Sequence, residues 1–112
     1  MAFTIETKPG ASSARLDLHG SFSAIELEQL IGDLARARAM MEPGVPRDPE
    51  PAVDVQADPQ IDPRFFVSEA PDHGGVVLRL RDPGTGWRAY RLPYNEAGRL
   101  AMLLDDWSRR RF

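Results

Sequence analysis

Residues 76–107, VVLRLRDPGTGWRAYRLPYNEAGRLAMLLDDW, decide the fold of this chain. Residues 76–81 place apolar side chains at alternate positions, which is typical of a strand with one buried face. The segment DPGTG at 82–86 predicts a hairpin turn, because proline fixes its own φ and glycine accepts a positive φ. The strand returns over about 87–92, and Asn95 is expected to cap a helix that continues to about residue 110. The stretch therefore predicts a β-hairpin followed by an amphipathic helix.

The first half of the chain has a similar pattern. Alternation at residues 3–5 and 15–19 predicts two strands, and a helix is expected over about 24–41. Ser23 and Glu26 have the spacing of a capping box, in which each side chain accepts a hydrogen bond from the other residue's backbone amide. The apolar positions of this helix return 73 residues later, as the pairs Leu27 and Leu100, Leu30 and Leu103, Ile31 and Leu104, and Leu34 and Trp107. Both halves are therefore predicted to consist of strands followed by an amphipathic helix.

A proline-rich acidic segment separates the two halves. Residues 42–63 contain six of the ten prolines, together with six acidic residues and one basic residue, which gives this segment a net charge of −5. Because proline has no amide donor and disfavours helix at the residue before it, we expect an extended, mobile linker here. A third strand is predicted over about 65–67, immediately after the linker.

These elements predict an α+β fold. The expected order is ββα-linker-βββα, arranged as a two-layer sandwich in which a mainly antiparallel sheet of about five strands has two helices on one face. At 112 residues the chain has the length of one domain, so residues 1–112 are expected to form a single domain with the linker at about 42–63.

Composition narrows the class of protein. The chain has no cysteine, which excludes disulfides, thiol catalysis and thiolate-based metal sites. No apolar stretch approaches the ~20 residues of a membrane-spanning helix, and the first residues lack the pattern of a signal peptide, so we expect a cytoplasmic protein that does not bind membranes. Of the 14 basic residues 13 are arginine, which indicates a bacterial-like genome composition more than a function.

One face of the predicted sheet has the composition of a binding surface. If Val76, Leu78, Leu80, Tyr90 and Leu92 face the helices, then alternation turns another set away from them. This set is Val77, Arg79, Arg81, Trp87 and Arg91, which we call the arginine–tryptophan face. Tryptophan and arginine are favoured at protein interfaces. The sequence therefore predicts a non-enzymatic protein-interaction or adaptor module, whose partner is another protein or a second copy of the chain.

Two alternatives stay open for the same face. Weak binding of single-stranded nucleic acid would use Trp87 to stack a base and the arginines to hold phosphates. In the simpler alternative the arginines pair with Glu6, Asp17 and Glu69 across strands, and the face is an ordinary solvated surface.

Catalytic and metal sites are not predicted. Asp17, His19 and Ser21 share one side of a strand, but their spacing is expected to keep the first two side chains apart, so they do not form a triad. His19 and His73 could meet with Asp72 around a metal ion, yet two histidines without a ligand spacing are a weak indication. His73 is expected to be a turn residue beside Gly74. We therefore predict no catalytic residues, no metal and no cofactor.

Overall fold

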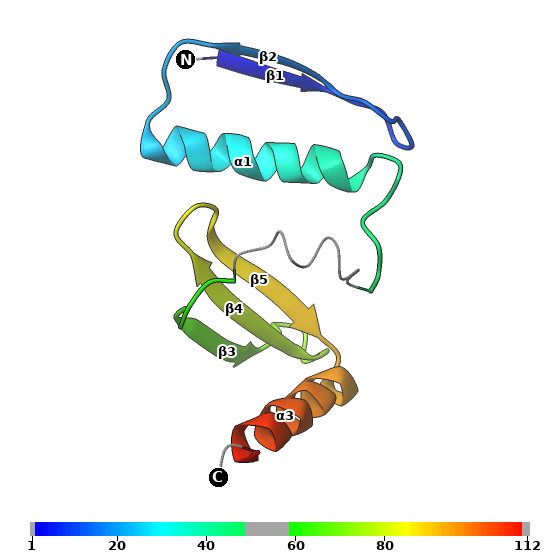
Figure 1. Ribbon diagram of the computed structural model, residues 1–112, viewed down its shortest axis with the longest axis vertical. Coiled ribbons are helices and arrows are strands. Elements are labelled where there is room, and N and C mark those ends of the chain that lie inside the picture. The colour runs from blue at the N-terminus through cyan, green and yellow to red at the C-terminus, as the bar shows by residue number, and fades with distance from the viewer. Residues whose placement is uncertain (1, 49–58, 111–112) are drawn as a thin grey trace. The chain divides into compact units, whose positions relative to one another are not determined.

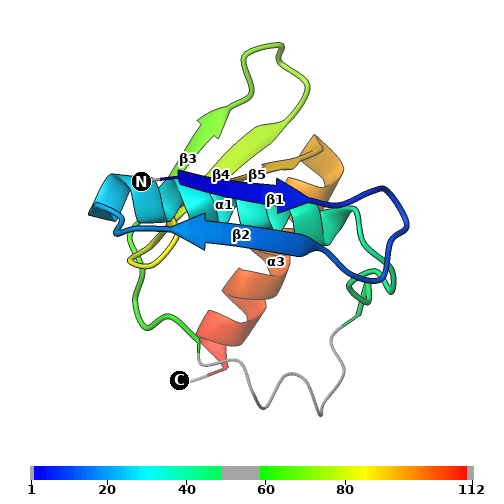
Figure 2. The same ribbon diagram turned by 90° about the horizontal axis from the view of Figure 1, so that it is seen from above.

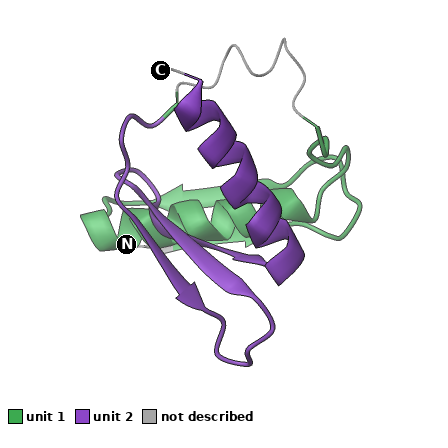
Figure 3. Ribbon diagram, turned by 90° about the horizontal axis from the view of Figure 1, so that it is seen from below, with its two compact units in different colours: residues 1–59 green, residues 60–112 purple. Residues whose placement is uncertain are grey.

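The computed structural model describes residues 2–48 and 59–110 of the chain. Within these residues the order of elements is two strands, a helix, three strands and a helix (Figure 1). The chain divides into two compact units, residues 1–59 and residues 60–112 (Figure 3). Unit 1 contains the first three elements, and unit 2 contains the other four.

Unit 1 is a β-hairpin with a helix packed along it. Strand β1 (Ala2–Glu6) pairs antiparallel with β2 (Arg15–His19). Helix α1 (Ala24–Ala39) runs beside the hairpin and contacts β1 (Figure 2). The rings of Phe3 and Phe22 have their centroids 6.3 Å apart, so the residue before the cap of α1 packs against the first strand.

The core of unit 1 forms between the helix and one face of the hairpin. The register puts four apolar side chains on this face, with Phe3 opposite Leu18 and Ile5 opposite Leu16. Leu30 and Ala37 are buried on α1, and they are seven residues apart, which is two turns of the helix. The apolar spacing seen in the sequence therefore selects the side of α1 that packs.

The start of α1 has the predicted capping box. The backbone amide of Glu26 donates to Ser23 Oγ at 3.2 Å, and the backbone amide of Ser23 donates to Glu26 Oε1 at 3.0 Å. These bonds satisfy amides that have no partner inside the helix. The backbone amide of Ser23, and then its hydroxyl, lower the pKa of Glu26 from its ordinary value. The capping box is confirmed, and the helix ends at Ala39, two residues before the predicted end.

Unit 2 is a three-stranded antiparallel sheet followed by a helix. Strands β3 (Phe65–Glu69), β4 (Val76–Asp82) and β5 (Gly86–Leu92) lie in the order β3-β4-β5. Helix α3 (Tyr94–Arg109) follows β5 directly. Each strand begins or ends within two residues of its predicted position.

Two turns of unit 2 depend on particular residues. Gly75 has a φ of 149°, and a Cβ at this position would overlap the backbone oxygen of Leu92, so only glycine fits where the β3–β4 turn meets the end of β5. In the β4–β5 turn, Asp82 Oδ1 accepts hydrogen bonds from the amides of Gly84 at 2.7 Å and Thr85 at 2.9 Å. These amides, that of Thr85 first, lower the pKa of Asp82.

The prediction that Asn95 caps the second helix is wrong. The helix begins at Tyr94, and Pro93 occupies the cap position without a side-chain hydrogen bond. Pro93 has φ −56° and ψ 156°, which is the extended backbone of a cap residue. Because proline fixes its φ and has no amide donor, it suits a boundary between strand and helix, and Asn95 lies inside the first turn.

The α+β class and the predicted order of strands and helices are confirmed. The strands do not form one sheet, however. In residues 2–48 and 59–110 they form a two-stranded sheet in unit 1 and a three-stranded sheet in unit 2. Each described strand pairs with a neighbour in sequence, and the short connections of such hairpins cost less closure entropy than a connection through the linker would. That residues 1–112 act as a single domain stays a prediction.

The linker predicted at 42–63 falls partly outside the described residues, because residues 49–58 are not among them. Its described ends, residues 42–48 and 59–63, contain neither helix nor strand. Among the helices that the structure describes, none is long and apolar enough to cross a membrane.

Candidate functional site

The arginine–tryptophan face lies on strands β4 and β5. The register places Val77 opposite Arg91 and Arg81 opposite Trp87, and Arg79 lies between them on β4. Since alternate side chains of a strand point to the same side, all five residues share one face of the sheet. The structure therefore brings together the set predicted from alternation. That these residues bind a partner stays a prediction.

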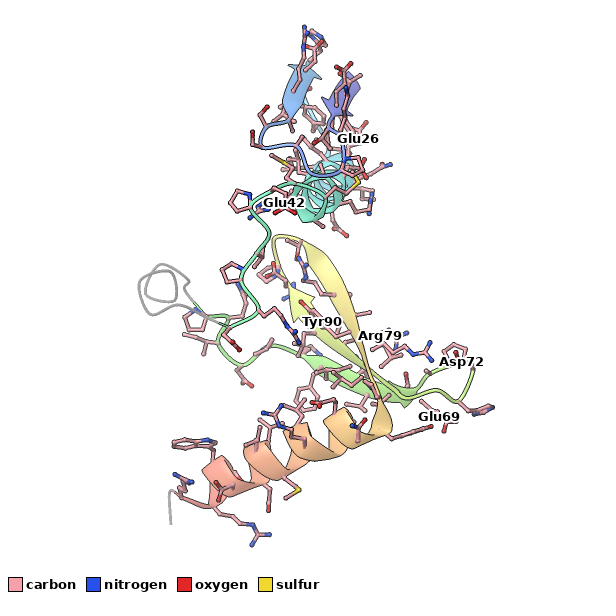
Figure 4. All side chains as sticks on the ribbon, turned by 90° about the vertical axis from the view of Figure 1, so that its right-hand side faces the viewer. Glu26, Glu42, Glu69, Asp72, Arg79 and Tyr90 are labelled. Carbon is pink, nitrogen blue, oxygen red and sulfur yellow. The ribbon has the colours of Figure 1, made fainter. Side chains whose placement is uncertain are left out.

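Helix α3 begins on the opposite side of this sheet. The Tyr94 hydroxyl donates to Glu69 Oε2 at 2.6 Å, and Glu69 is paired with Val76, whose side chain points away from that of Val77. Figure 4 shows Arg79 on the side of the sheet away from α3 and Glu69 beside the start of that helix. The arginine–tryptophan face therefore stays uncovered within unit 2.

An aromatic pair lies on this face, and one of its members was not predicted. Phe66 of β3 is opposite Arg79, so its side chain joins the same face. Its ring centroid is 5.5 Å from that of Trp87, with an interplanar angle of 49°. Phe66 is 55% exposed and Trp87 is 48% exposed. Residues 65–67 are all apolar, so the sequence does not show to which face of the sheet each side chain points. The register of β3 against β4 shows that Phe66 lies on the arginine–tryptophan face.

The three arginines of the face differ in their partners. Arg91 Nη2 donates to both carboxylate oxygens of Asp72, at 2.6 and 2.8 Å, and this guanidinium is the main reason that the pKa of Asp72 is lowered. Arg79 Nη1 donates to the uncharged Ser68 Oγ at 3.0 Å. Arg81 has no carboxylate within 4.0 Å among the described residues of unit 2. Two of the three positive charges are therefore without an ionic partner there.

The predicted pairing of these arginines with Glu69 is wrong, because within unit 2 Glu69 bonds to His73 and Tyr94. Glu6 and Asp17 belong to unit 1, so their pairing with the arginines stays a prediction. The ionic partner of Arg91 is Asp72, which the sequence did not predict. Asp72 lies in the β3–β4 turn, and residues of a turn do not alternate between two faces, so alternation could not indicate this pair. The ion pair between Arg91 and Asp72 is solvent-exposed, so water screens it strongly and its main effect is to neutralise the charge of Arg91 on this face.

A second polar cluster surrounds Glu69, on the other side of the sheet from the arginine–tryptophan face. His73 Nδ1 lies 2.7 Å from Glu69 Oε1, and the Tyr94 hydroxyl bonds to the other carboxylate oxygen. The Tyr94 hydroxyl, and then His73, lower the pKa of Glu69, and the same bond to Glu69 raises the pKa of Tyr94. His73 has a φ of 58°, which agrees with its predicted place in a turn. The three side chains are exposed, so this cluster links a strand, a turn and a helix start at the surface.

The expectation that Asp17 and His19 stay apart is wrong. His19 Nε2 lies 3.0 Å from Asp17 Oδ1, because both side chains lean along the strand toward each other. Both are exposed, and no hydrogen bond joins His19 to Ser21 in the structure, so the base-to-nucleophile contact of a triad is missing. No group of three metal-ligating side chains gathers anywhere in residues 2–48 and 59–110.

Two open grooves occur in unit 1. One, of about 320 Å³, runs between β1 and α1 and is lined by Phe3, Ile5, Ala37 and Met40 among others. The second, of about 470 Å³, is lined by residues at the end of β1, in the loop after it and at the start of β2, and it shares Ile5 and Thr7 with the first. Neither groove is lined by a histidine, and so neither has an acid–base group of the kind considered in the sequence.

Comparison with known proteins adds no assignment: the chain has no significant match to a protein-family model, a curated protein or a solved structure.

Proposed function

We propose that this chain is a non-enzymatic protein-interaction or adaptor module that binds its partner through the arginine–tryptophan face. The observation that supports the proposal is the pair of adjacent rings, Phe66 and Trp87, each about half exposed on a face that also holds three arginines. Residues of these types contribute most of the binding energy in many interfaces, where they fill pockets of the partner. A cytoplasmic location is part of the proposal and rests on composition alone.

The charges of the face indicate the chemistry of the partner. Asp72 neutralises Arg91, whereas Arg79 and Arg81 are without a carboxylate partner in the described residues of unit 2. A matching surface would offer an apolar pocket for the ring pair and acidic side chains for these two guanidinium groups. The partner is then a protein surface that is apolar at its centre and acidic at its edge.

The experiment is affinity capture by the tagged full-length chain, with two test variants and two matched controls. Trp87→Ala and Arg81→Ala alter the face. The first control, Trp107→Ala, removes the other tryptophan, which is exposed on α3. The second control is Arg88→Ala. Arg88 follows Trp87 in the sequence, but its side chain points to the other side of the sheet and donates to the Tyr90 hydroxyl at 3.1 Å. We expect the test variants to lose a specific partner and the controls to keep it. Equal capture by all four variants would refute the role of the face.

Single-stranded nucleic acid is the second candidate, because a ring pair beside Arg79 and Arg81 can stack a base and hold phosphates. The test is titration of a mixed oligonucleotide, followed by the fluorescence of Trp87 in a Trp107→Phe background. Binding to phosphates should weaken with salt, with a log–log slope of about −0.7 for each phosphate contact. If the oligonucleotide causes no salt-sensitive change in fluorescence, this candidate is excluded.

A second copy of the chain is a further candidate partner for the same face. In that case Trp87→Arg should convert a dimer to a monomer, because it removes the ring and adds a positive charge beside Arg81. Mass in solution, measured by light scattering, decides this. An unchanged mass would exclude self-association through the arginine–tryptophan face.

A further inference from the structure

The free edge of the three-stranded sheet is a second surface with binding chemistry. Among the described residues of unit 2, strand β3 pairs with β4 and with no other strand. The backbone oxygen of Arg64 accepts from Arg81, and the amide of Ala70 donates to Gly75, both at 2.9 Å. In an antiparallel pair the residues that bond to a given neighbour alternate along the strand. Residues 64, 66, 68 and 70 therefore point their backbone groups at β4, and Phe65, Val67 and Glu69 point theirs outward.

Within the described residues of unit 2, this edge has none of the features that usually protect an exposed strand. Edge strands of natural proteins are commonly blocked by lysine, proline, a bulge or a covering segment. Residues 65–69 contain no lysine or proline, and their register against β4 continues without a bulge. Phe65 is 66% exposed and Val67 is 62% exposed. The single charge, on Glu69, is already engaged by Tyr94 and His73.

We propose that β3 pairs antiparallel with β3 of a second copy of the chain, with Val67 opposite Val67 about a two-fold axis perpendicular to the sheet. This register pairs all three outward residues of each copy, because Phe65 then lies opposite Glu69 of the second copy. A register centred on Phe66 leaves Glu69 without a partner. The Val67-centred arrangement therefore uses every outward amide and carbonyl of the strand.

Charge also favours this occupant and this direction. In the antiparallel register Glu69 lies opposite Phe65 and Arg64 opposite Ala70 of the second copy, and Arg64 and Glu69 point to different faces of the sheet, so no charge meets a like charge. A parallel pair would place arginine beside arginine and glutamate beside glutamate, which is unfavourable. The strand is thus compatible with a second copy of itself in the antiparallel direction, as a two-fold interface requires.

The pairing has a consequence for the arginine–tryptophan face. A two-fold axis perpendicular to the sheet keeps the same faces together, so both copies of the face lie on one side of a continuous sheet. A partner with two sites could then bind both copies and gain avidity. The edge proposal does not depend on that function, because the face and the edge use different atoms.

The first test is the mass of the full-length chain by sedimentation equilibrium, from low micromolar to near-millimolar concentration. We expect a concentration-dependent dimer. Val67→Lys should weaken it by about tenfold or more, because two lysines would then face each other across the axis. The control is Ile61→Lys, which replaces an even more exposed apolar side chain outside the strand, 91% against 62% for Val67, and should leave the dimer unchanged. A monomer at all concentrations, or equal effects of the two variants, would overturn the proposal.

A crosslinking test fixes the register and does not depend on the lysine variant folding. The chain has no cysteine, so Val67→Cys introduces its only thiol. Directly opposite residues in a bonded antiparallel pair have Cα atoms about 5.5 Å apart, within the reach of a disulfide. In Ser68→Cys the Cα atoms of the two cysteines would be about 8 Å apart, which is too far for a disulfide bond. Rapid crosslinking at 67 and slow crosslinking at 68 support the register, and equal rates overturn it.

Hydrogen exchange separates pairing with a second copy from pairing within the chain. We expect the amides of Phe65, Val67 and Glu69 to become protected as concentration rises. If they are protected equally in a monomer, the edge is covered by another part of the same chain, and the proposal is wrong.

Discussion

Replacing Leu30 with alanine should destabilise unit 1 by about 2–3 kcal/mol. Among the described residues, Leu30 is the largest of the three buried apolar side chains, and it lies on the side of α1 that faces the hairpin. Removing its outer carbons forfeits roughly 2–2.5 kcal/mol of transfer free energy, at about 0.8 kcal/mol for each group. The cavity adds little, because the groove along the same side of the helix is already open and lets neighbours relax.

The matched control is Leu104→Ala on α3. Leu104 is 63% exposed, so its truncation should change the free energy of unfolding by no more than about 0.5 kcal/mol. Both changes are leucine to alanine within a 16-residue helix, so helix propensity affects them alike. The difference between the two variants is therefore the effect of burial.

Urea denaturation followed by two signals shows where the effect falls. Both tryptophans, Trp87 and Trp107, lie in unit 2, so fluorescence reports on unit 2 alone, whereas far-ultraviolet circular dichroism reports on both helices. If residues 1–112 unfold as one domain, Leu30→Ala shifts both signals equally. If the units unfold independently, it shifts only the dichroism. A cost for Leu30→Ala no larger than that for Leu104→Ala would refute the packing argument itself.

Three further predictions concern local contacts. Ser23→Ala should cost about 1 kcal/mol in the free energy of unfolding, with Ser21→Ala as the neutral control, both measured by thermal melting followed by circular dichroism. The pKa values of Glu69 and Asp72 are lowered in the folded state. Their ionised forms therefore stabilise the fold at pH values above the ordinary pKa values of 4.5 and 3.8, and this stabilisation is lost as the pH falls through the folded-state pKa values. The double variant Glu69→Gln, Asp72→Asn should make the free energy of unfolding less dependent on pH in this acidic range. Gly75→Ala should destabilise unit 2 more than Gly98→Ala on α3, because an added Cβ meets the backbone of Leu92 at position 75 and open space at position 98; equal denaturation midpoints would contradict this.

Sequence patterns predicted the local elements of this chain well and the long-range pairing poorly. The capping box of Ser23 and Glu26 and the alternation of β4 act within a few residues, so they can be recognised without knowing the fold. Whether the hairpin of unit 1 joins the sheet of unit 2 depends on hydrogen bonds between distant strands. Alternation favours both arrangements equally, because it sets only which face is apolar and not which strand lies alongside.

The same limit applies to the candidate site. Alternation placed Arg79, Arg81 and Trp87 on one face, because a strand has a period of two. Phe66 and Asp72 were missed, since the first lies in an all-apolar run and the second in a turn. Their positions follow from the register of β3 against β4, and that register is set by a turn in which Gly75 has to pass close to Leu92.

The repeat in the sequence explains why α3 is less covered than α1. The two helices begin 70 residues apart, whereas their apolar pattern recurs after 73, so the apolar stripe lies almost one turn further along α3. The start of α3 meets β5 and Glu69 through Tyr94, and exposure then rises from 45% at Leu103 to 64% at Trp107. No residue of α3 is buried in unit 2 as the structure describes it.

The two proposals for unit 2 can be separated because the residues involved differ. Val67→Lys acts at the outward edge of β3 and leaves Trp87 and Arg81 unchanged, so a monomer produced in this way should still bind a partner through one face. Trp87→Ala acts on the face and leaves the outward backbone groups of β3 intact, so it should keep the edge-paired dimer and lose the partner. If both hold, Val67→Lys should reduce binding to a two-site partner much more than to a one-site partner, since only the former depends on avidity. An equal reduction for both partners would mean that the edge substitution damages the face itself, and then the sheet of unit 2 would have to be treated as one binding surface.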